Sequence, residues 1–245
     1  MKLSVIITAY NQDDITLVHA REAMASSRVP DEVIVVNDGG DPGLLDKLKT
    51  LDFKCKFIYA RINEDIPWNY NGACNLAAFL STGDLLAFED NDNIPSQDFY
   101  EVALDYLAKN PEVKRLTGKI RHVVSREDIL TKPKSEWKEI NHIGPNQGTA
   151  IIYRDIYTKV KGQDERFCGE YGWMYPNWRR LLLNRVKVQF GSIGMYYYTE
   201  QGQSPLSRKM SARNSGLLRI NSRTNLLQAP IGILNFTYTI EILHL

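Results

Sequence analysis

The sequence predicts an α/β protein with a mainly parallel, doubly wound central sheet. Short apolar runs alternate with helical segments between Leu3 and Glu89, and this alternation is typical of right-handed crossovers between parallel strands. Each run ends in polar residues, as buried strands do where they reach the carboxyl edge of a sheet. A chain of 245 residues suits one such domain, alone or with an appendage.

The regular elements of the first half follow from apolar periodicity and from helix start and stop signals. Four apolar runs are expected as strands: Leu3 to Ile7, Glu32 to Val36, Cys55 to Tyr59 and Leu85 to Glu89. Four helices are expected: from Asp13 or Asp14 as cap to about Ala25, from Asp41 and Pro42 onward, from Asn71 to Thr82 before Gly83, and from Gln97 to Lys109 with Ser96 as cap.

The second half is less regular. Residues 125–146 are rich in Lys, Glu, Asp and Pro, and a segment of this length predicts a functional or mobile loop. A strand over 149–153, a helix over 154–161, a helix over 178–184 and an extended segment over 186–190 are expected next. Residues 199–225 are polar and irregular.

The end of the chain alternates with a period of two. From Leu234 to Ile242 every second residue is apolar and the residues between are polar, which predicts a strand with one apolar face. Two interpretations stay open. The strand covers the core of its own domain, or its apolar edge adds to a second copy of the chain and forms a homo-oligomer.

Composition excludes several classes of partner. The 30 Lys and Arg residues nearly cancel the 29 Asp and Glu residues, so no whole-chain field attracts nucleic acid or an anionic membrane. Cys55, Cys74 and Cys168 are far apart and lack metal spacing, which fits reduced thiols better than disulfides. The chain shows neither a signal-peptide pattern nor an apolar stretch of about 18 residues. We therefore expect a cytoplasmic protein without a transmembrane segment.

An acidic cluster at residues 89–93 follows directly on a predicted strand. Carboxylates two apart on an extended segment point the same way, so Asp90 and Asp92 would repel each other without a cation. Mg²⁺ or Mn²⁺ is the expected occupant, because carboxylate oxygens suit these ions and substrate phosphates complete their shell. A Ca²⁺-binding EF-hand loop is excluded, since Pro95 stands where that loop needs glycine.

Four segments in order, Ser4 to Asn11, Val33 to Asp41, Asn71 to Asn93 and Gly148 to Tyr171, together resemble the inverting family 2 glycosyltransferases of the GT-A fold. The resemblance implies transfer of a sugar from a nucleotide diphosphate donor, usually UDP-linked, to a hydroxyl of a glycan or another acceptor. It also implies inversion at the anomeric carbon and the help of Mn²⁺ or Mg²⁺.

The resemblance assigns the donor base to the ends of the first two strands. Thr8, Ala9 and Tyr10 would line the base pocket, with Tyr10 against the flat uracil face. Asp38 matches the family aspartate that accepts a hydrogen bond from the uracil ring nitrogen, although the residue before it is Asn37 instead of the usual aspartate.

The resemblance places the donor diphosphate beside the helix that Asn71 and Gly72 open, because a helix amino terminus suits phosphate. The family's common Ala-Arg-Asn reads Ala-Cys-Asn here, with Cys74 at the arginine position. Arg208 lies in the irregular basic stretch and is expected to close over the diphosphate as part of a lid.

Asp90, Asn91 and Asp92 match the family's DxD motif, with Asp90 on the ribose side of the donor and Asp92 on the metal. We expect both aspartates at the metal site. Glu170 is the first candidate for the base that removes the acceptor's proton, and Asp164 is the second. The family's usual aspartate after Glu170 is a tyrosine here.

The expected organisation is a GT-A catalytic domain over residues 1–200 and a C-terminal extension over 201–245. The catalytic domain comprises a nucleotide-sugar-binding half (1–93) and an acceptor half (94–200). A catalytically inactive nucleotide-sugar-binding or assembly protein is the alternative, because several family residues are replaced. A sugar nucleotidyltransferase would need a glycine-rich basic loop after the first strand, and residues 8–14 contain no Gly, Lys or Arg.

Overall fold

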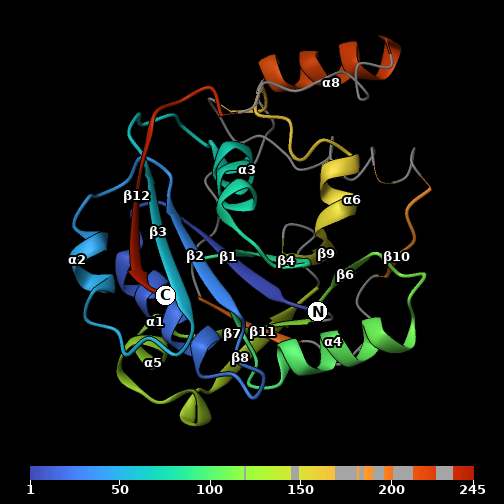
Figure 1. Cartoon of the computed structure of the whole chain (residues 1–245). Coiled ribbons are helices and arrows are strands. Elements are labelled where there is room, and N and C mark those ends of the chain that lie inside the picture. The colour runs from blue at the N-terminus through green and yellow to red at the C-terminus, as the bar shows by residue number, and fades with distance from the viewer. Residues whose placement is uncertain are drawn as a thin grey trace.

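The computed structural model describes residues 1–118, 120–144, 149–168, 181, 185–189, 196–200, 212–224 and 234–245. Within these residues it confirms the α/β fold. One sheet of eight strands has the order β10-β6-β9-β4-β1-β2-β3-β12, and a second sheet has the order β5-β11-β7-β8. Figure 1 shows helices on both sides of the large sheet.

The strands of the large sheet are β1 (Leu3–Ala9), β2 (Glu32–Asn37), β3 (Lys56–Ile62), β4 (Leu85–Asp90), β6 (Arg115–Thr117), β9 (Ala150–Tyr153), β10 (Val188–Gln189) and β12 (Tyr238–His244). The strands of the second sheet are β5 (Asn93–Pro95), β7 (Ile120–Val124), β8 (Glu139–Ile143) and β11 (Tyr196–Glu200). The described helices are α1 (Asp13–Met24), α2 (Leu44–Leu48), α3 (Tyr70–Leu80), α4 (Phe99–Lys109), α5 (Arg126–Thr131), α6 (Arg154–Lys159) and α8 (Ala212–Thr224).

Strands β4, β1, β2 and β3 are parallel neighbours, as the alternation of strands and helices predicts. Their side chains feed two cores, because successive residues of a strand point to opposite faces. Val5 and Ile7 pack with α1, α2 and α4, whereas Ile6 packs with α3 and α6. The parallel strands therefore share one carboxyl edge, and the polar ends of β1, β2 and β4 meet there.

Two expected helix caps are wrong. Helix α1 begins at Asp13 after Gln12, and no side chain caps it; the carboxylate of Asp13 pairs instead with Lys47 at 3.2 Å. Helix α4 begins at Phe99 after Asp98, and the Ser96 hydroxyl donates to the Asp98 carboxylate at 2.9 Å instead of capping the helix.

The long loop expected over residues 125–146 is also wrong in its described part. It contains α5, a short 3-10 helix (Lys134–Glu136) and β8. Ser125 caps α5 by accepting a hydrogen bond from the Asp128 backbone at 3.0 Å. Ile129 and Trp137 are buried in a small core with residues of α1, and Lys134 pairs with Glu22 of α1 at 3.2 Å. Apolar and ionic contacts with α1 therefore both hold this mostly polar segment.

The alternating C-terminal segment forms a strand, as predicted. Strand β12 pairs antiparallel with β3 and lies beside it in Figure 1. Phe236 and Tyr238 pack on the core next to α3, which confirms that the segment covers its own domain. Ile240 and Ile242 remain 43% and 57% exposed, and association with a second copy stays a prediction.

The described helices include none that is both long and apolar enough to cross a bilayer.

Candidate active site

The ends of β1, β2 and β4 form one site because of the sheet register. Thr8 is paired with Asp90 of β4, and Ala9 is paired with Asn37 of β2. Asp38 follows Asn37, and its backbone N–H donates to the Ala9 carbonyl at 2.8 Å. The residues predicted for the donor base and the predicted acidic pair therefore meet at adjacent strand ends.

Asp38 is a buried carboxylate with an unused acceptor. It is 7% exposed, and its Oδ1 accepts no hydrogen bond from the described residues. Burial raises the pKa of Asp38 to about 7, while the neighbouring Asn69 acts in the opposite direction. Asp65 raises this pKa further by its negative charge. A buried acceptor without a donor is costly, and it suits a ligand that brings an N–H group.

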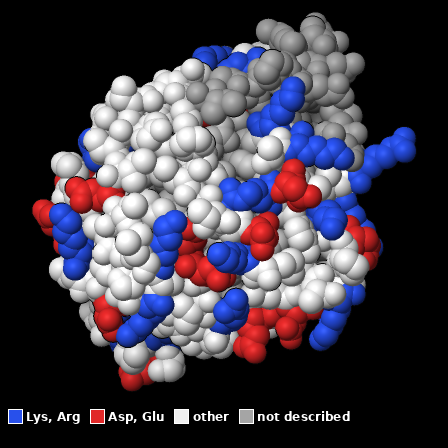
Figure 2. Space-filling model, in the orientation of Figure 1, with Lys and Arg blue, Asp and Glu red and all other residues white. Residues whose placement is uncertain are grey.

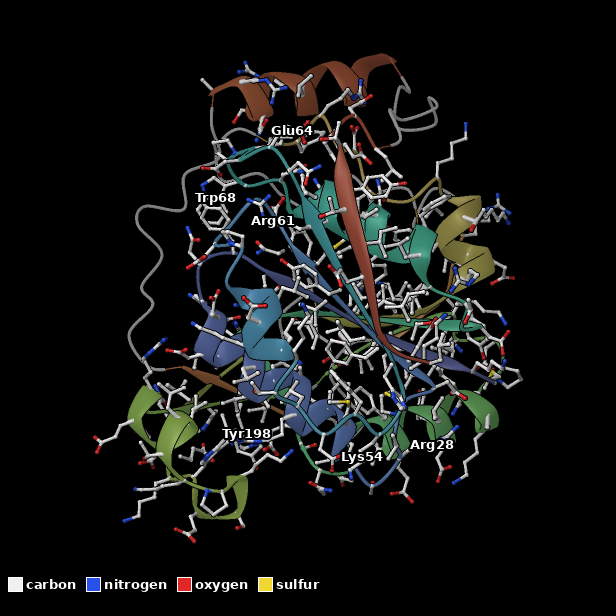
Figure 3. All side chains as sticks on the ribbon, turned by 60° about the vertical axis from the view of Figure 1, so that its left-hand side comes forward. Arg28, Lys54, Arg61, Glu64, Trp68 and Tyr198 are labelled. Atoms are coloured by element: carbon white, nitrogen blue, oxygen red, sulfur yellow. The ribbon has the colours of Figure 1, made fainter. Side chains whose placement is uncertain are left out.

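Exposed aromatic rings lie at the same edge. Tyr10 is 46% exposed, and its hydroxyl donates to Asp65 Oδ1 at 3.2 Å, which orients the ring. Trp68, in the loop after β3, is 54% exposed and has a positive φ of 53°. Figure 3 places Trp68 with Arg61 at the end of the sheet opposite Lys54. Flat aromatic faces of this kind suit a planar base.

Asp90 and Asp92 lie close together at the start of the turn after β4. Asn93 Nδ2 donates to Asp90 Oδ2 at 3.3 Å and to Asp92 Oδ1 at 3.0 Å, so one amide group bridges the two carboxylates. Burial raises the pKa of Asp92 to about 6, and the negative charge of Asp90 acts in the same direction. The pair thus carries negative charge that a cation would stabilise.

The donor set fits Mg²⁺ or Mn²⁺. Among the described residues, no group of three or more His, Cys, Asp or Glu side chains could hold a metal ion. Two carboxylates alone suit a hard cation that completes its shell with water and phosphate oxygens, whereas zinc sites use three or four protein ligands. The residues present therefore fit a metal that arrives with a phosphorylated substrate.

Asn71 and Gly72 lie in the first turn of α3, which begins at Tyr70, but their described contacts are internal. Asn71 Nδ2 donates to the carbonyls of Asp164 at 3.1 Å and Phe167 at 3.2 Å. A Cβ on Gly72 would lie 2.6 Å from Phe236 Cε1, so close packing accounts for glycine at this position. A direct role of either residue in donor binding stays a prediction.

Asp164 is occupied by a neighbour. It is 1% exposed and receives two hydrogen bonds from the Arg166 guanidinium, at 2.8 Å to Oδ1 and 2.6 Å to Oδ2. This fork-like pairing holds the segment that leads toward Gly169. Glu170 and Arg208, which the sequence predicts as base and lid, lie outside the described residues.

The sequence did not single out several residues that shape this edge. They are Thr16 and His19 on α1, Asn69 beside Asp38, and Asn93, which bridges the aspartates. Only Asn93 carried a signal, because it stands within the acidic cluster. The contacts of the other three join residues far apart in the sequence, which no local pattern reveals.

The surface agrees with the balanced composition. Figure 2 shows Lys and Arg side chains interspersed with Asp and Glu on the face in view, with no large area of one sign.

A family model described as glycosyl transferase family 2 matches residues 4–176, which is more than half of the 245 residues. The chain belongs to glycosyltransferase family 2. The membership and the GT-A type fold that the resemblance implied are thereby confirmed. A comparison with curated protein sequences finds no significant match.

Solved structures share the fold of this glycosyltransferase. The S. aureus TarS fragment 1-349 in complex with UDP-GlcNAc has a TM-score of 0.68 and 17% identity, over 92% of this chain and 67% of that one. The mannosyltransferase PcManGT from Pyrobaculum calidifontis, in complex with GDP-Man and Mn²⁺, has a TM-score of 0.58 and 16% identity, over 83% and 58%. M. tuberculosis glucosyl-3-phosphoglycerate synthase has a TM-score of 0.56 and 14% identity, over 94% and 81%.

These solved structures are longer than this chain, which spans 67% of the TarS fragment and 58% of the mannosyltransferase. At these identities the likeness shows the fold.

Proposed function

We propose that this family 2 glycosyltransferase transfers a sugar from a UDP-sugar to an acceptor hydroxyl, with inversion, in a metal-dependent reaction. The observation that carries the proposal is the meeting of Asp38, Tyr10 and the Asp90–Asp92 pair at one sheet edge. The solved structures with UDP-GlcNAc and with GDP-Man and Mn²⁺ support a nucleotide sugar as donor.

Asp38 supplies base selectivity. Its unpaired Oδ1 is buried, and the uracil ring presents an N–H that such an acceptor satisfies. Cytosine presents an acceptor at the same ring position, so two acceptors would face each other. The Tyr10 ring stacks on the flat face of the base, and the Tyr10 hydroxyl donates a hydrogen bond to Asp65.

Asp92 and Asp90 are the residues that would hold Mn²⁺ or Mg²⁺. When bound, the ion offsets the negative charge that gathers on the departing diphosphate. Asn93 keeps the two carboxylates together through its amide. Arg208 is proposed to contact the diphosphate from the basic stretch of residues 199–225.

The base is proposed to be Glu170, because a carboxylate must reach the acceptor hydroxyl to take its proton. Asp164, the second candidate, has both oxygens engaged by Arg166, which leaves it a poorer acceptor of that proton. The boundary at residue 200 between catalytic domain and extension stays a prediction, as does a cytoplasmic location.

Association through β12 belongs to the same proposal. Ile240 and Ile242 lie exposed on a strand that has a neighbour, β3, on one side, and an exposed apolar edge strand favours pairing with another chain. Light scattering on wild type and on an Ile240→Thr, Ile242→Thr variant tests this. A monomeric wild type would contradict it.

The activity is tested by release of UDP from a panel of UDP-sugars with and without Mn²⁺. We expect metal-dependent release by wild type, a loss of at least about 100-fold in Asp92→Asn, and wild-type rates in Asp46→Asn. Asp46 is the matched control because its side chain is 86% exposed on α2. Nucleotide binding without turnover of any donor would favour the inactive binding protein instead.

A further inference from the structure

Helix α1 presents polar side chains to the turn that carries Asp90 and Asp92. Gln12 immediately precedes the helix, and Thr16 and His19 follow after four and three residues, so the three lie on one helix face. Thr16 and His19 are fully buried. Figure 1 shows α1 on the side of the sheet that also carries α2 and α4.

All three side chains contact Asn91, the middle residue of the turn. Asn91 Nδ2 donates to Gln12 Oε1 at 3.3 Å and to Thr16 Oγ1 at 3.1 Å. The Thr16 hydroxyl donates to the Gln12 carbonyl at 2.9 Å, so its oxygen acts only as an acceptor toward Asn91. The carbonyl of Asn91 lies 3.1 Å from His19 Nδ1. The backbone N–H of Asn91 donates to the Thr8 carbonyl at 3.3 Å.

The His19 ring is itself fixed by a buried carboxylate. Its Nε2 lies 2.7 Å from Glu89 Oε2, and the Tyr100 hydroxyl donates to the same oxygen at 3.1 Å. Because the Asn91 carbonyl can only accept a hydrogen bond, His19 Nδ1 must carry a proton. A second proton lies in the hydrogen bond between His19 Nε2 and Glu89 Oε2. Glu89 therefore sets the orientation in which His19 meets the turn.

The geometry points to Thr16 and His19 as positioning residues that hold Asp90 and Asp92 in the arrangement that binds a metal ion with the donor diphosphate. This inference rests on the proposed function. Apolar residues of similar volume often stabilise a fold as well as a buried polar pair does, so stability alone does not explain why His19 and Glu89 are buried here. The contact of His19 with the Asn91 carbonyl explains it, because that contact positions the turn.

The test uses Thr16→Val, which keeps the branched shape but removes the acceptor of Asn91 Nδ2. Loss of a group that supports metal ligands typically weakens metal affinity by about 10- to 100-fold. We expect Mn²⁺ binding in the presence of UDP, measured from the electron paramagnetic resonance signal of free Mn²⁺, to weaken about 10-fold in Thr16→Val. Thr16→Ser retains the hydroxyl and should bind as wild type does.

Ser26→Ala is the matched control, because it removes a buried hydroxyl that donates to the Glu22 carbonyl at 3.2 Å and has no described contact with Asn91, His19 or Glu89, and its Mn²⁺ affinity should stay that of wild type. Hydrogen exchange of the protein without metal gives a second readout. The amides of residues 90–93 should exchange faster in Thr16→Val, while those of α4 keep their protection. A His19→Leu, Glu89→Leu variant, which replaces the buried pair with apolar residues, repeats both measurements if Thr16→Val does not fold.

Equal Mn²⁺ affinity and equal exchange in wild type and a folded variant would overturn the positioning role alone. A wild type that binds no Mn²⁺ with UDP would overturn the proposed function, and the inference with it.

Discussion

Replacing Asp38 with asparagine should change how the stability of the protein depends on pH. The pKa of Asp38 lies at about 7 in the folded protein, against an ordinary value of 3.8 for this side chain. At about 1.4 kcal/mol per pKa unit, the free energy of protonating Asp38 differs by ~4 kcal/mol between the folded and unfolded states. The folded state holds this proton more tightly than the unfolded state does. Stability from this group is therefore present at low pH and is lost as pH rises from about 4 to about 7.

Between about pH 5 and pH 8, linkage assigns about 3 kcal/mol of this loss to Asp38. Urea unfolding at a series of pH values measures it, as the difference between the curves of wild type and Asp38→Asn. Asp52→Asn is the control, because the Asp52 side chain is 83% exposed. Parallel curves for wild type and Asp38→Asn would refute the buried, unpaired carboxylate.

The same variant should alter base preference. Asparagine can place an N–H where the carboxylate offered an acceptor, so UDP binding should fall while CDP binding is favoured, because cytosine has an acceptor at that ring position. Calorimetric titration with both nucleotides measures the ratio. An unchanged preference for UDP would remove Asp38 from base recognition.

Three further outcomes follow from the site. Gly72→Ala should lower the free energy of unfolding by about 1–3 kcal/mol, since the new Cβ would lie 2.6 Å from Phe236. Gly216→Ala is the control in thermal unfolding. A Cβ there has no described atom within 4 Å, so this change should be neutral or slightly stabilising. Mn²⁺ affinity in the presence of UDP should fall as pH drops below about 6, because protons then compete with the metal for the Asp92 carboxylate. An affinity that does not change with pH would argue against Asp92 as a metal ligand. Glu170→Gln should lower turnover by at least about 100-fold with UDP affinity intact, and a variant that keeps more than a tenth of the rate would exclude the base role.

Much of the fold was predictable because strand ends carry a local signal. The runs ending at Ala9, Asn37 and Asp90 are short, apolar and followed by polar residues, so both the parallel sheet and the edge that carries the candidate site follow from the sequence alone. The acidic pair Asp90 and Asp92 was predictable for the same reason. The alternation after Leu234 likewise predicted β12.

The second sheet was not predictable in this way. β5 is only three residues long, and β8 is exposed along its whole length, so neither shows an apolar pattern. Within residues 125–144 two buried side chains, Ile129 and Trp137, reach a small core beside α1, and such isolated apolar residues form no periodic pattern. The contacts of His19 could not be predicted, because its partner Glu89 lies 70 residues away and a single histidine in a helix carries no signal of its own.

The most direct test of the donor site is calorimetric titration of UDP, with GDP and CDP as controls, with and without Mn²⁺, on wild type and Asp92→Asn. The proposed donor site predicts that wild type binds UDP in preference to GDP and CDP, that binding requires Mn²⁺, and that Asp92→Asn loses the metal-dependent part. Absence of nucleotide binding under every condition, or metal-dependent binding that Asp92→Asn retains in full, would contradict it.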